Sequence, residues 1–133
     1  MGNGVWAGYC YKWALKSTER RYGLEHAKIA EHVRNLGNIA WEYGRLEEAR
    51  CYYARTLVIN EKEYGLGHPI VLGNIHDLGK VLYEIGSPIG NLQGVIKYYK
   101  EMLMKFRKRL GREHPYIKEL HDTLKRYLSM EKF

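Results

Sequence analysis

The chain has little cysteine, little proline and no long run of apolar residues. Its 133 residues include 2 cysteines and 3 prolines, too few for a disulfide framework or a proline-rich linker. No uninterrupted apolar stretch approaches the ~20 residues that span a bilayer, so we expect no membrane insertion. The N-terminus lacks the basic region followed by an apolar region that marks a secretory signal. These absences predict a cytoplasmic protein, with the nucleus as the alternative.

Sequence motifs of catalysis are missing as well. No serine lies in a nucleophile-elbow context, and no glycine-rich phosphate loop precedes a predicted helix. The only aspartates, Asp77 and Asp122, fall at neighbouring positions of the helix repeat rather than on opposite sides of a pocket. No His-x-x-x-His or Cys-x-x-Cys spacing occurs. We therefore expect no enzymatic activity, no cofactor and no metal site.

The composition is that of a folded globular domain with excess positive charge. Hydrophobic residues make up 45% of the chain and charged residues 28%. The formal net charge is +7, and residues 97–133 contain 11 basic side chains against 5 acidic ones. Such a balance favours acidic partners through long-range attraction. Nucleic acid, an anionic membrane surface and an acidic protein all fit this description.

The sequence repeats itself. The string YGLEH at residues 22–26 recurs as YGLGH at 64–68, an offset of 42, and as LGREH at 110–114, a further offset of 46. The change of offset falls near residues 87–94, whose Ser, Pro, Gly and Asn content is typical of a four-residue loop insertion. A period of this length indicates an array of supersecondary units, each burying its apolar face against the next.

Each repeat contains two apolar stripes with helical spacing. In the first stripe, apolar side chains recur every three or four residues, which places them on one helix face. The first stripe is Ile29, Val33, Leu36, Ala40 and Tyr43, repeated as Val71, Ile75, Leu78, Leu82 and Ile85. The second stripe is Leu46, Ala49, Tyr53 and Leu57, with Leu92, Val95, Tyr99, Leu103, Phe106 and Leu110 as its counterpart.

Glycine and proline mark the predicted helix ends. Gly44 and Gly86 follow the first helix of each pair, where a left-handed residue ends a helix. Pro69 and Pro115 stand in a first helical turn, where the missing N–H is not needed. The predicted helices are residues 5–21, 27–43, 46–63, 69–85, 92–110 and 115–130. Because a two-helix unit cannot bury its stripe alone, we predict an all-α fold, an α-solenoid of antiparallel helix pairs.

The repeat resembles the tetratricopeptide repeat family, in the form typical of kinesin light chain. The matching strings are GLGHP at 65–69, GREHP at 111–115, GRLEEA at 44–49, and VRNLG at 33–37 with IHDLG at 75–79 in place of the family's LNNLA. From Gly67 onward the chain also resembles, more weakly, the C-terminal helical domain of SET-and-MYND-type lysine methyltransferases. The resemblance implies an α-solenoid that binds other proteins.

The repeat register predicts a single tetratricopeptide-like domain over residues 1–133. Residues 1–21 are a second helix without its first, and residues 22–63 are one repeat. Residues 64–110 are a repeat with the insertion near 87–94, and residues 111–133 are a terminal capping helix. We expect either a fragment of a longer protein or a shortened array whose exposed end is covered.

Three histidines, His26, His68 and His114, share one repeat position. Metal ligation by all three is unfavourable, because residues one repeat apart are too distant for ligand bonds near 2 Å. The preferred interpretation is a helix-start residue that packs or caps within each repeat.

The family resemblance implies that the first helix of each pair lines a concave groove. The residues placed there by position are Arg34, Asn38, Trp41, His76, Lys80, Tyr83, Asp122 and Arg126. Arginine can bind carboxylates with two hydrogen bonds, and Trp and Tyr supply rigid apolar contact. The main hypothesis is a non-enzymatic adaptor that binds an acidic or carboxylate-bearing peptide in this groove. The alternative is that these are ordinary solvated positions.

A second hypothesis concerns the basic helix. Its residues could contact phosphates of nucleic acid or another anionic surface, with binding that weakens as salt rises. They are Lys97, Lys100, Lys105, Arg107, Lys108, Arg109 and Arg112. Tyr99, Leu103 and Phe106 belong to the buried stripe, so no aromatic is left to stack on bases. A solvated basic face is the alternative interpretation.

Two further hypotheses concern assembly. The chain could be a regulatory fragment of a larger enzyme, such as a methyltransferase, or of a ubiquitin-ligase receptor. The predicted N-terminal helix also carries an apolar stripe whose repeat partner is missing, and such patches mark interfaces. Its residues are Val5, Trp6, Tyr9 and Trp13. We expect them to contact a second copy, forming a homodimer, or the missing part of a longer chain.

Overall fold

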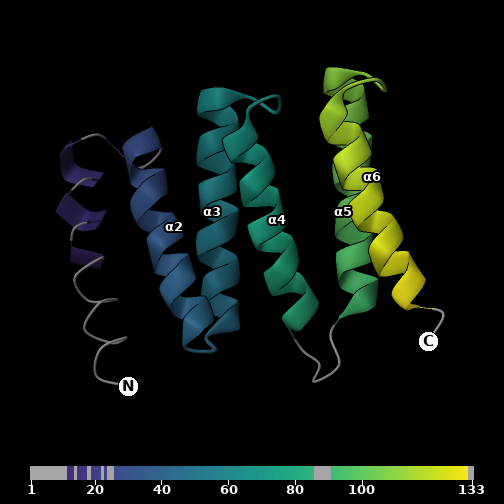
Figure 1. Ribbon diagram of the computed structural model, residues 1–133. Helices are drawn as coiled ribbons and strands as arrows, with labels where there is room; N and C mark the ends of the chain where they lie inside the picture. Colours follow the sequence, from purple (N-terminus) through teal and green to yellow (C-terminus); the bar gives the residue numbers. More distant parts are fainter. Residues whose placement is uncertain are drawn as a thin grey trace. The chain divides into compact units, whose positions relative to one another are not determined.

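The computed structural model describes residues 12–13, 15–17, 19–21, 23, 26–85 and 91–131. All regular secondary structure in these ranges is α-helical, and the predicted helix boundaries hold to within one residue (Figure 1). The helices are α2 (Ala27–Glu42), α3 (Leu46–Tyr64), α4 (Pro69–Glu84), α5 (Leu92–Leu110) and α6 (Pro115–Met130). The predicted helix 5–21 is helical at its described residues between 12 and 21, and its remainder lies outside the described residues.

The chain divides into two compact units, Met1–Gly65 and Leu66–Phe133. In the first unit α2 packs along α3, and in the second α5 packs against both α4 and α6. Each pair runs antiparallel (Figure 1). These pairs confirm the predicted class, an all-α fold built from antiparallel helix pairs like those of tetratricopeptide repeats.

Histidine caps begin three of the helices. The Nδ1 atoms of His26, His68 and His114 accept hydrogen bonds from the backbone N–H groups two residues later, at 3.1, 3.1 and 3.2 Å. Each histidine has extended backbone, as an N-cap requires. The capping interpretation is therefore confirmed, and it accounts for the recurrence of histidine at this repeat position.

Glycine lets the two helices of a pair approach closely. A Cβ atom on Gly37 would lie 2.7 Å from the ring of Tyr53, and one on Gly79 would lie 2.5 Å from the hydroxyl oxygen of Tyr99. Both contacts join a first helix to the second helix of the same pair. The repeated Leu-Gly step thus makes room for a repeated tyrosine.

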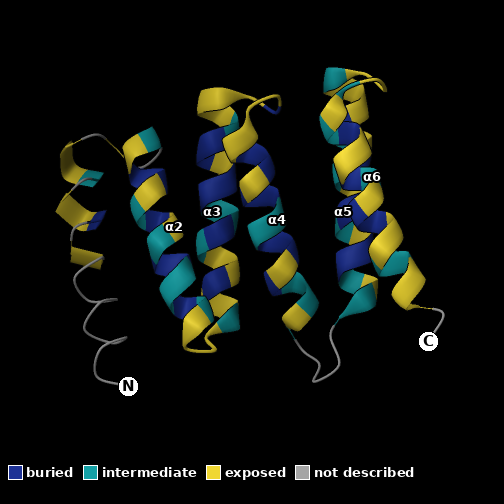
Figure 2. Ribbon diagram, in the orientation of Figure 1, coloured by how far each residue is buried: buried dark blue, intermediate teal, exposed yellow. Residues whose placement is uncertain are grey.

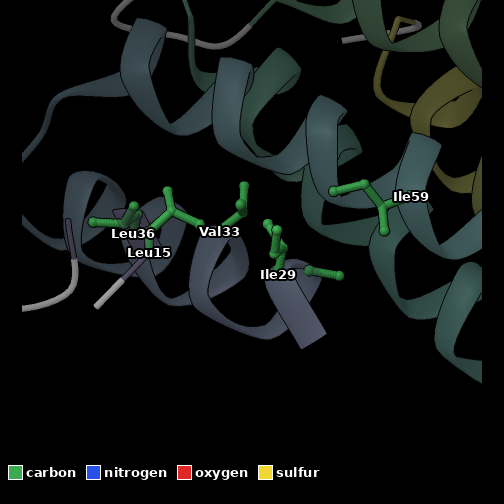
Figure 3. Packing of buried hydrophobic residues seen from close by; sticks show 6 residues of the cluster. Leu15, Ile29, Val33, Leu36 and Ile59 are labelled. Carbon is green, nitrogen blue, oxygen red and sulfur yellow. The ribbon is translucent and has the colours of Figure 1, made fainter. Parts of the chain in front are cut away.

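The core of the first unit joins three segments. Leu15, from the N-terminal region, packs with Ile29, Val33 and Leu36 of α2 and with Ile59 of α3 (Figure 3). An ion pair of 2.8 Å between Glu19 and Arg55 adds a second link between the N-terminal region and α3. The segment before α2 is thus anchored to the first helix pair.

Buried and exposed residues alternate along the helices, as the stripes predicted (Figure 2). Val71, Val95 and Phe106 are fully buried in the second unit. Tyr43 is an exception, because it follows the end of α2 and is 46% exposed. The predicted stripe is therefore wrong at this position. Gly44 follows with φ of 74°, which confirms the left-handed helix end, while Gly86 lies outside the described residues.

In the part of the chain that the structure describes, none of the helices is long and apolar enough to cross a membrane.

Candidate functional site

The second unit contains a pocket of about 530 Å³ among α4, α5 and α6. It combines two cations, a carboxylate, a histidine, two phenols and a hydroxyl group. Its lining residues are His76, Lys80, Tyr99, Glu119, Thr123, Arg126, Tyr127 and Met130. Such a volume lies within the range of sites that take small ligands or single peptide side chains.

The floor of the pocket is Tyr99 of α5, which is 1% exposed. Gly79 leaves space for the Tyr99 ring between α4 and α5. Tyr127 of α6 stacks on this ring with 5.7 Å between ring centroids and 23° between ring planes. Tyr83 in turn contacts Tyr127, with centroids 5.6 Å apart. The three helices are therefore joined by aromatic contacts beneath the polar groups of the pocket.

His76 is held on both ring nitrogens. Its Nδ1 lies 2.8 Å from the Tyr99 hydroxyl, and its Nε2 lies 3.4 Å from Oε1 of Glu119. A carboxylate can only accept hydrogen bonds, so Nε2 carries the proton toward Glu119 and Nδ1 accepts from Tyr99. The result is a chain of polar contacts from α5 through α4 to α6.

Burial sets the protonation of these groups. It is the largest cause that lowers the pKa of His76 below the ordinary value of 6.5, and the nearby Lys80 and Arg126 lower the pKa further. Glu119 acts in the opposite direction, through its charge and its hydrogen bond. Burial also raises the pKa of the Tyr99 hydroxyl above its usual value of 10.0, so this group stays protonated. His76 is thus neutral near pH 7, while Tyr99 is a donor.

The cations of the pocket come from two helices. Lys80 of α4 and Arg126 of α6 are both exposed. A guanidinium nitrogen of Arg126 lies 3.2 Å from the hydroxyl oxygen of Thr123, a contact that orients the side chain at the pocket edge. With one carboxylate, Glu119, against two permanent cations, the pocket has an excess of positive charge.

The structure brings together part of the predicted groove. His76, Lys80 and Arg126 line one pocket, and Tyr83 adjoins it through Tyr127. Asp122 is exposed on α6 and is not among the lining residues.

The other three predicted groove residues belong to α2, in the first unit. Arg34 is exposed and Trp41 is partly buried. Asn38 accepts a hydrogen bond from the hydroxyl of Tyr53. Part of the Asn38 side chain is therefore already committed within its own helix pair.

Sequence reasoning missed Glu119, Thr123, Tyr127 and Met130, and assigned Tyr99 only to the core. A signal for Tyr99 was available in the repeat register. Its equivalent, Tyr53, donates to Asn38, but the position equivalent to Asn38 is Lys80, which has no acceptor. The Tyr99 hydroxyl therefore turns to another partner, His76.

The structure describes all seven residues of the predicted basic helix but only one residue of the predicted self-association stripe. Lys105 is partly buried, whereas the other six predicted basic residues are exposed. Trp13 is 75% exposed, while Val5, Trp6 and Tyr9 lie outside the described residues. Within the described ranges, no group of three or more His, Cys, Asp or Glu side chains could hold a metal ion.

Comparison with known families identifies the first helix pair. A family model of the tetratricopeptide repeat matches residues 30–70, which cover most of α2, all of α3 and the first two residues of α4. Residues 30–70 are a tetratricopeptide repeat. The predicted family resemblance is therefore confirmed for this segment, and tetratricopeptide repeats generally mediate protein–protein interaction. The chain has no significant match among curated proteins.

All lining residues of the pocket lie outside the segment that matches the tetratricopeptide repeat. Only the first two residues of α4, which carries His76 and Lys80, fall within the match. The lining residues begin at His76, six positions after the match ends at residue 70. The weaker likeness to SET-and-MYND-type methyltransferases stays a prediction.

Proposed function

We propose that this tetratricopeptide-repeat protein is a non-enzymatic adaptor whose second unit binds an acidic or carboxylate-bearing peptide. The observation that carries the proposal is the pocket in which Lys80 of α4 and Arg126 of α6 flank a single volume of about 530 Å³. Cations contributed by two helices can grip one anionic group from two sides. The remaining lining residues offer apolar surface and hydrogen-bonding groups to the rest of a peptide.

An acidic side chain or chain end matches the polar groups of the pocket. Arg126 can bind a carboxylate with two parallel hydrogen bonds, while Lys80 supplies a point charge. Tyr127 and Met130 offer apolar surface to the aliphatic part of the ligand. Glu119 opposes an anion, so the best ligand places its charge on the side of Arg126 and Lys80 and a hydrogen-bond donor toward Glu119.

Arg34, Asn38 and Trp41 form a second proposed contact region on α2. Arg34 offers a charged group, and Trp41 offers a rigid apolar surface of the kind enriched at binding hot spots. Their contribution is separable from that of the pocket, because no pocket residue comes from α2.

The test is fluorescence polarisation with a labelled peptide that ends in four glutamates, against the same peptide with four glutamines and an amidated C-terminus. We expect Lys80→Ala and Arg126→Ala each to weaken binding of the glutamate peptide by roughly 5- to 10-fold, the loss of one charged contact. Lys118→Ala and Lys125→Ala are matched controls, because these α6 lysines are exposed and do not line the pocket.

Two results would contradict the proposal. One is equal affinity of the parent protein for the glutamate and glutamine peptides. The other is an equal loss of binding in the pocket variants and in the lysine controls, which would indicate nonspecific attraction to net charge. Arg34→Glu then reports separately on α2, since it leaves every pocket residue in place.

The exposed face of α5 favours a second candidate function, binding to nucleic acid. Lys97, Lys100 and Lys108 lie on one face at helical spacing, around Met104, which is 65% exposed. One exposed methionine offers little surface for insertion into a membrane, whereas a row of cations can neutralise successive phosphates. We expect a 20-nucleotide single strand to bind, with an affinity that falls steeply between about 50 and 200 mM salt.

Charge reversal tests this second candidate. Lys97→Glu with Lys108→Glu removes the row of cations, and Lys118→Glu with Lys125→Glu is a control with the same change in net charge. Absence of a complex at low salt, or an equal effect of both pairs, would refute binding through this face.

A further inference from the structure

His76 occupies a position from which a single proton changes the charge of the pocket. Its Nδ1 accepts from Tyr99 of α5 at 2.8 Å, and its Nε2 faces Glu119 of α6 at 3.4 Å. In the neutral ring Nδ1 is the only nitrogen that can take up another proton. The site of protonation is therefore the atom that now receives the Tyr99 hydrogen bond.

The charged groups around His76 oppose one another. Lys80 on its own helix and Arg126 on α6 disfavour a positive imidazole, as does burial, while Glu119 on α6 favours it. Tyr99, the group from α5, is a protonated phenol and adds no charge. Neutrality of His76 thus depends on the absence of a further negative charge in the pocket.

We infer that an anion entering this pocket makes His76 take up a proton, so that His76 becomes a third cation beside Lys80 and Arg126. This inference rests on the proposed function and specifies how the same site is regulated. The negative charge of the ligand attracts a positive imidazole ring. This attraction offsets burial and the charges of Lys80 and Arg126, which otherwise keep His76 neutral. By linkage, the same coupling makes anion binding tighter as the pH falls.

The proton comes from solvent and goes to Nδ1 of His76. Tyr99 stays protonated but changes role, since its oxygen accepts from the new Nδ1–H and its own O–H no longer donates to His76. That O–H can turn toward the bound anion, because Tyr99 lines the pocket. One protonation event therefore adds both a positive charge and a hydrogen-bond donor, and Glu119 continues to hold Nε2–H.

The experiment is isothermal titration calorimetry with a peptide in which cysteic acid replaces each glutamate, so that the ligand keeps its charge between about pH 5.5 and 8. Titrations in two buffers of different ionisation enthalpy give the number of protons taken up. We expect uptake of a fraction of one proton near pH 6, none near pH 8, and binding about 3- to 10-fold tighter at the lower pH.

His76→Gln is the decisive variant, because glutamine retains hydrogen bonding but cannot be protonated. It should abolish the proton uptake that accompanies peptide binding and make the binding affinity nearly independent of pH. His121→Gln, on α6 and outside the pocket lining, should leave both unchanged. As a measurement that needs no variant, the NMR titration of the His76 ring in the parent protein should shift to higher pH when the peptide is bound.

Failure of the inference is distinguishable from failure of the proposed function. If Lys80→Ala and Arg126→Ala weaken binding but the parent takes up no proton, or His76→Gln takes up as much as the parent, the inference is wrong and the binding site stands. An unshifted NMR titration of His76 in the complex would also overturn it. If Lys80→Ala and Arg126→Ala bind as tightly as the parent, the proposed function itself is wrong.

Discussion

At the residue scale, His76 should make the stability of the protein depend on pH. Burial, the largest cause, lowers its pKa below 6.5 in the folded state. The unfolded chain therefore binds this proton more readily, so the stabilisation is complete above about pH 6.5 and is lost as the pH falls through the folded pKa. We expect the unfolding free energy of His76→Gln to change less between pH 7.5 and pH 5 than that of the parent.

Urea titrations at the two pH values measure this difference. His121→Gln serves as the control, because the same substitution on α6 leaves His76 and its partners in place. Equal pH dependence of the parent and His76→Gln would show that His76 stays as protonatable in the fold as in the unfolded chain.

A second residue-scale prediction concerns the histidine caps. His68 satisfies the backbone N–H of Ile70 at 3.1 Å, and this is one of the donors that the first turn of α4 leaves without a helical partner. We expect His68→Ala to lower the unfolding free energy by about 0.5–1 kcal/mol, and His68→Asn, which can also cap, to restore most of it. Chemical denaturation measures the unfolding free energy of both variants. An equal loss of unfolding free energy in His68→Ala and His68→Asn would argue against capping.

At the scale of the element, α4 contains two glycines with opposite roles. Gly73 has nothing within 4 Å of an added Cβ, whereas a Cβ on Gly79 would meet the buried Tyr99. We expect Gly73→Ala to stabilise the protein by about 0.5–1 kcal/mol through helix propensity. Gly79→Ala should destabilise it by about 1–3 kcal/mol, because α4 and α5 must move apart.

Both α4 variants can be compared by thermal unfolding followed by circular dichroism. Gly79→Ala should also weaken peptide binding in the assay described above, since it displaces the tyrosine that contacts His76. A stabilised Gly79→Ala variant would show that α5 accommodates the extra methyl group without loss of packing.

At the scale of the whole molecule, the described residues before α2 include one buried and one exposed apolar side chain. Leu15 is 7% exposed and Trp13 is 75% exposed. We propose that Trp13 and Trp6 contact a second copy of the chain. The double variant Trp6→Ala, Trp13→Ala should then shift the protein toward the monomer at micromolar concentration, as measured by light scattering.

Leu15→Ala separates folding from assembly in the same region. Because Leu15 packs on the core of the first unit, its truncation should lower the unfolding free energy by about 2–4 kcal/mol. A parent protein that is already monomeric, with its tryptophans freely quenched by iodide, would refute the self-association proposal.

The amino-acid sequence by itself determined the helices, their ends and the resemblance to a tetratricopeptide repeat. Those features depend on local information: the spacing of Val33 and Leu36 defines a helix face, His68 and Pro69 begin a helix, and Gly44 ends one. The repeat made each of these signals visible more than once. The same register assigned His76, Lys80 and Arg126 to one predicted groove, and these three residues line one pocket.

Only the tertiary structure decided which of these residues meet. Repeat counting set Asp122 as the position equivalent to His76, yet Glu119, nearly one turn earlier on α6, is the residue that faces it. The physical reason is that periodicity specifies the face of a helix, while the offset along the axes of neighbouring helices depends on side-chain packing. The use of Tyr99 as both core and pocket floor has the same origin, since its hydroxyl finds its partner on a different helix, α4.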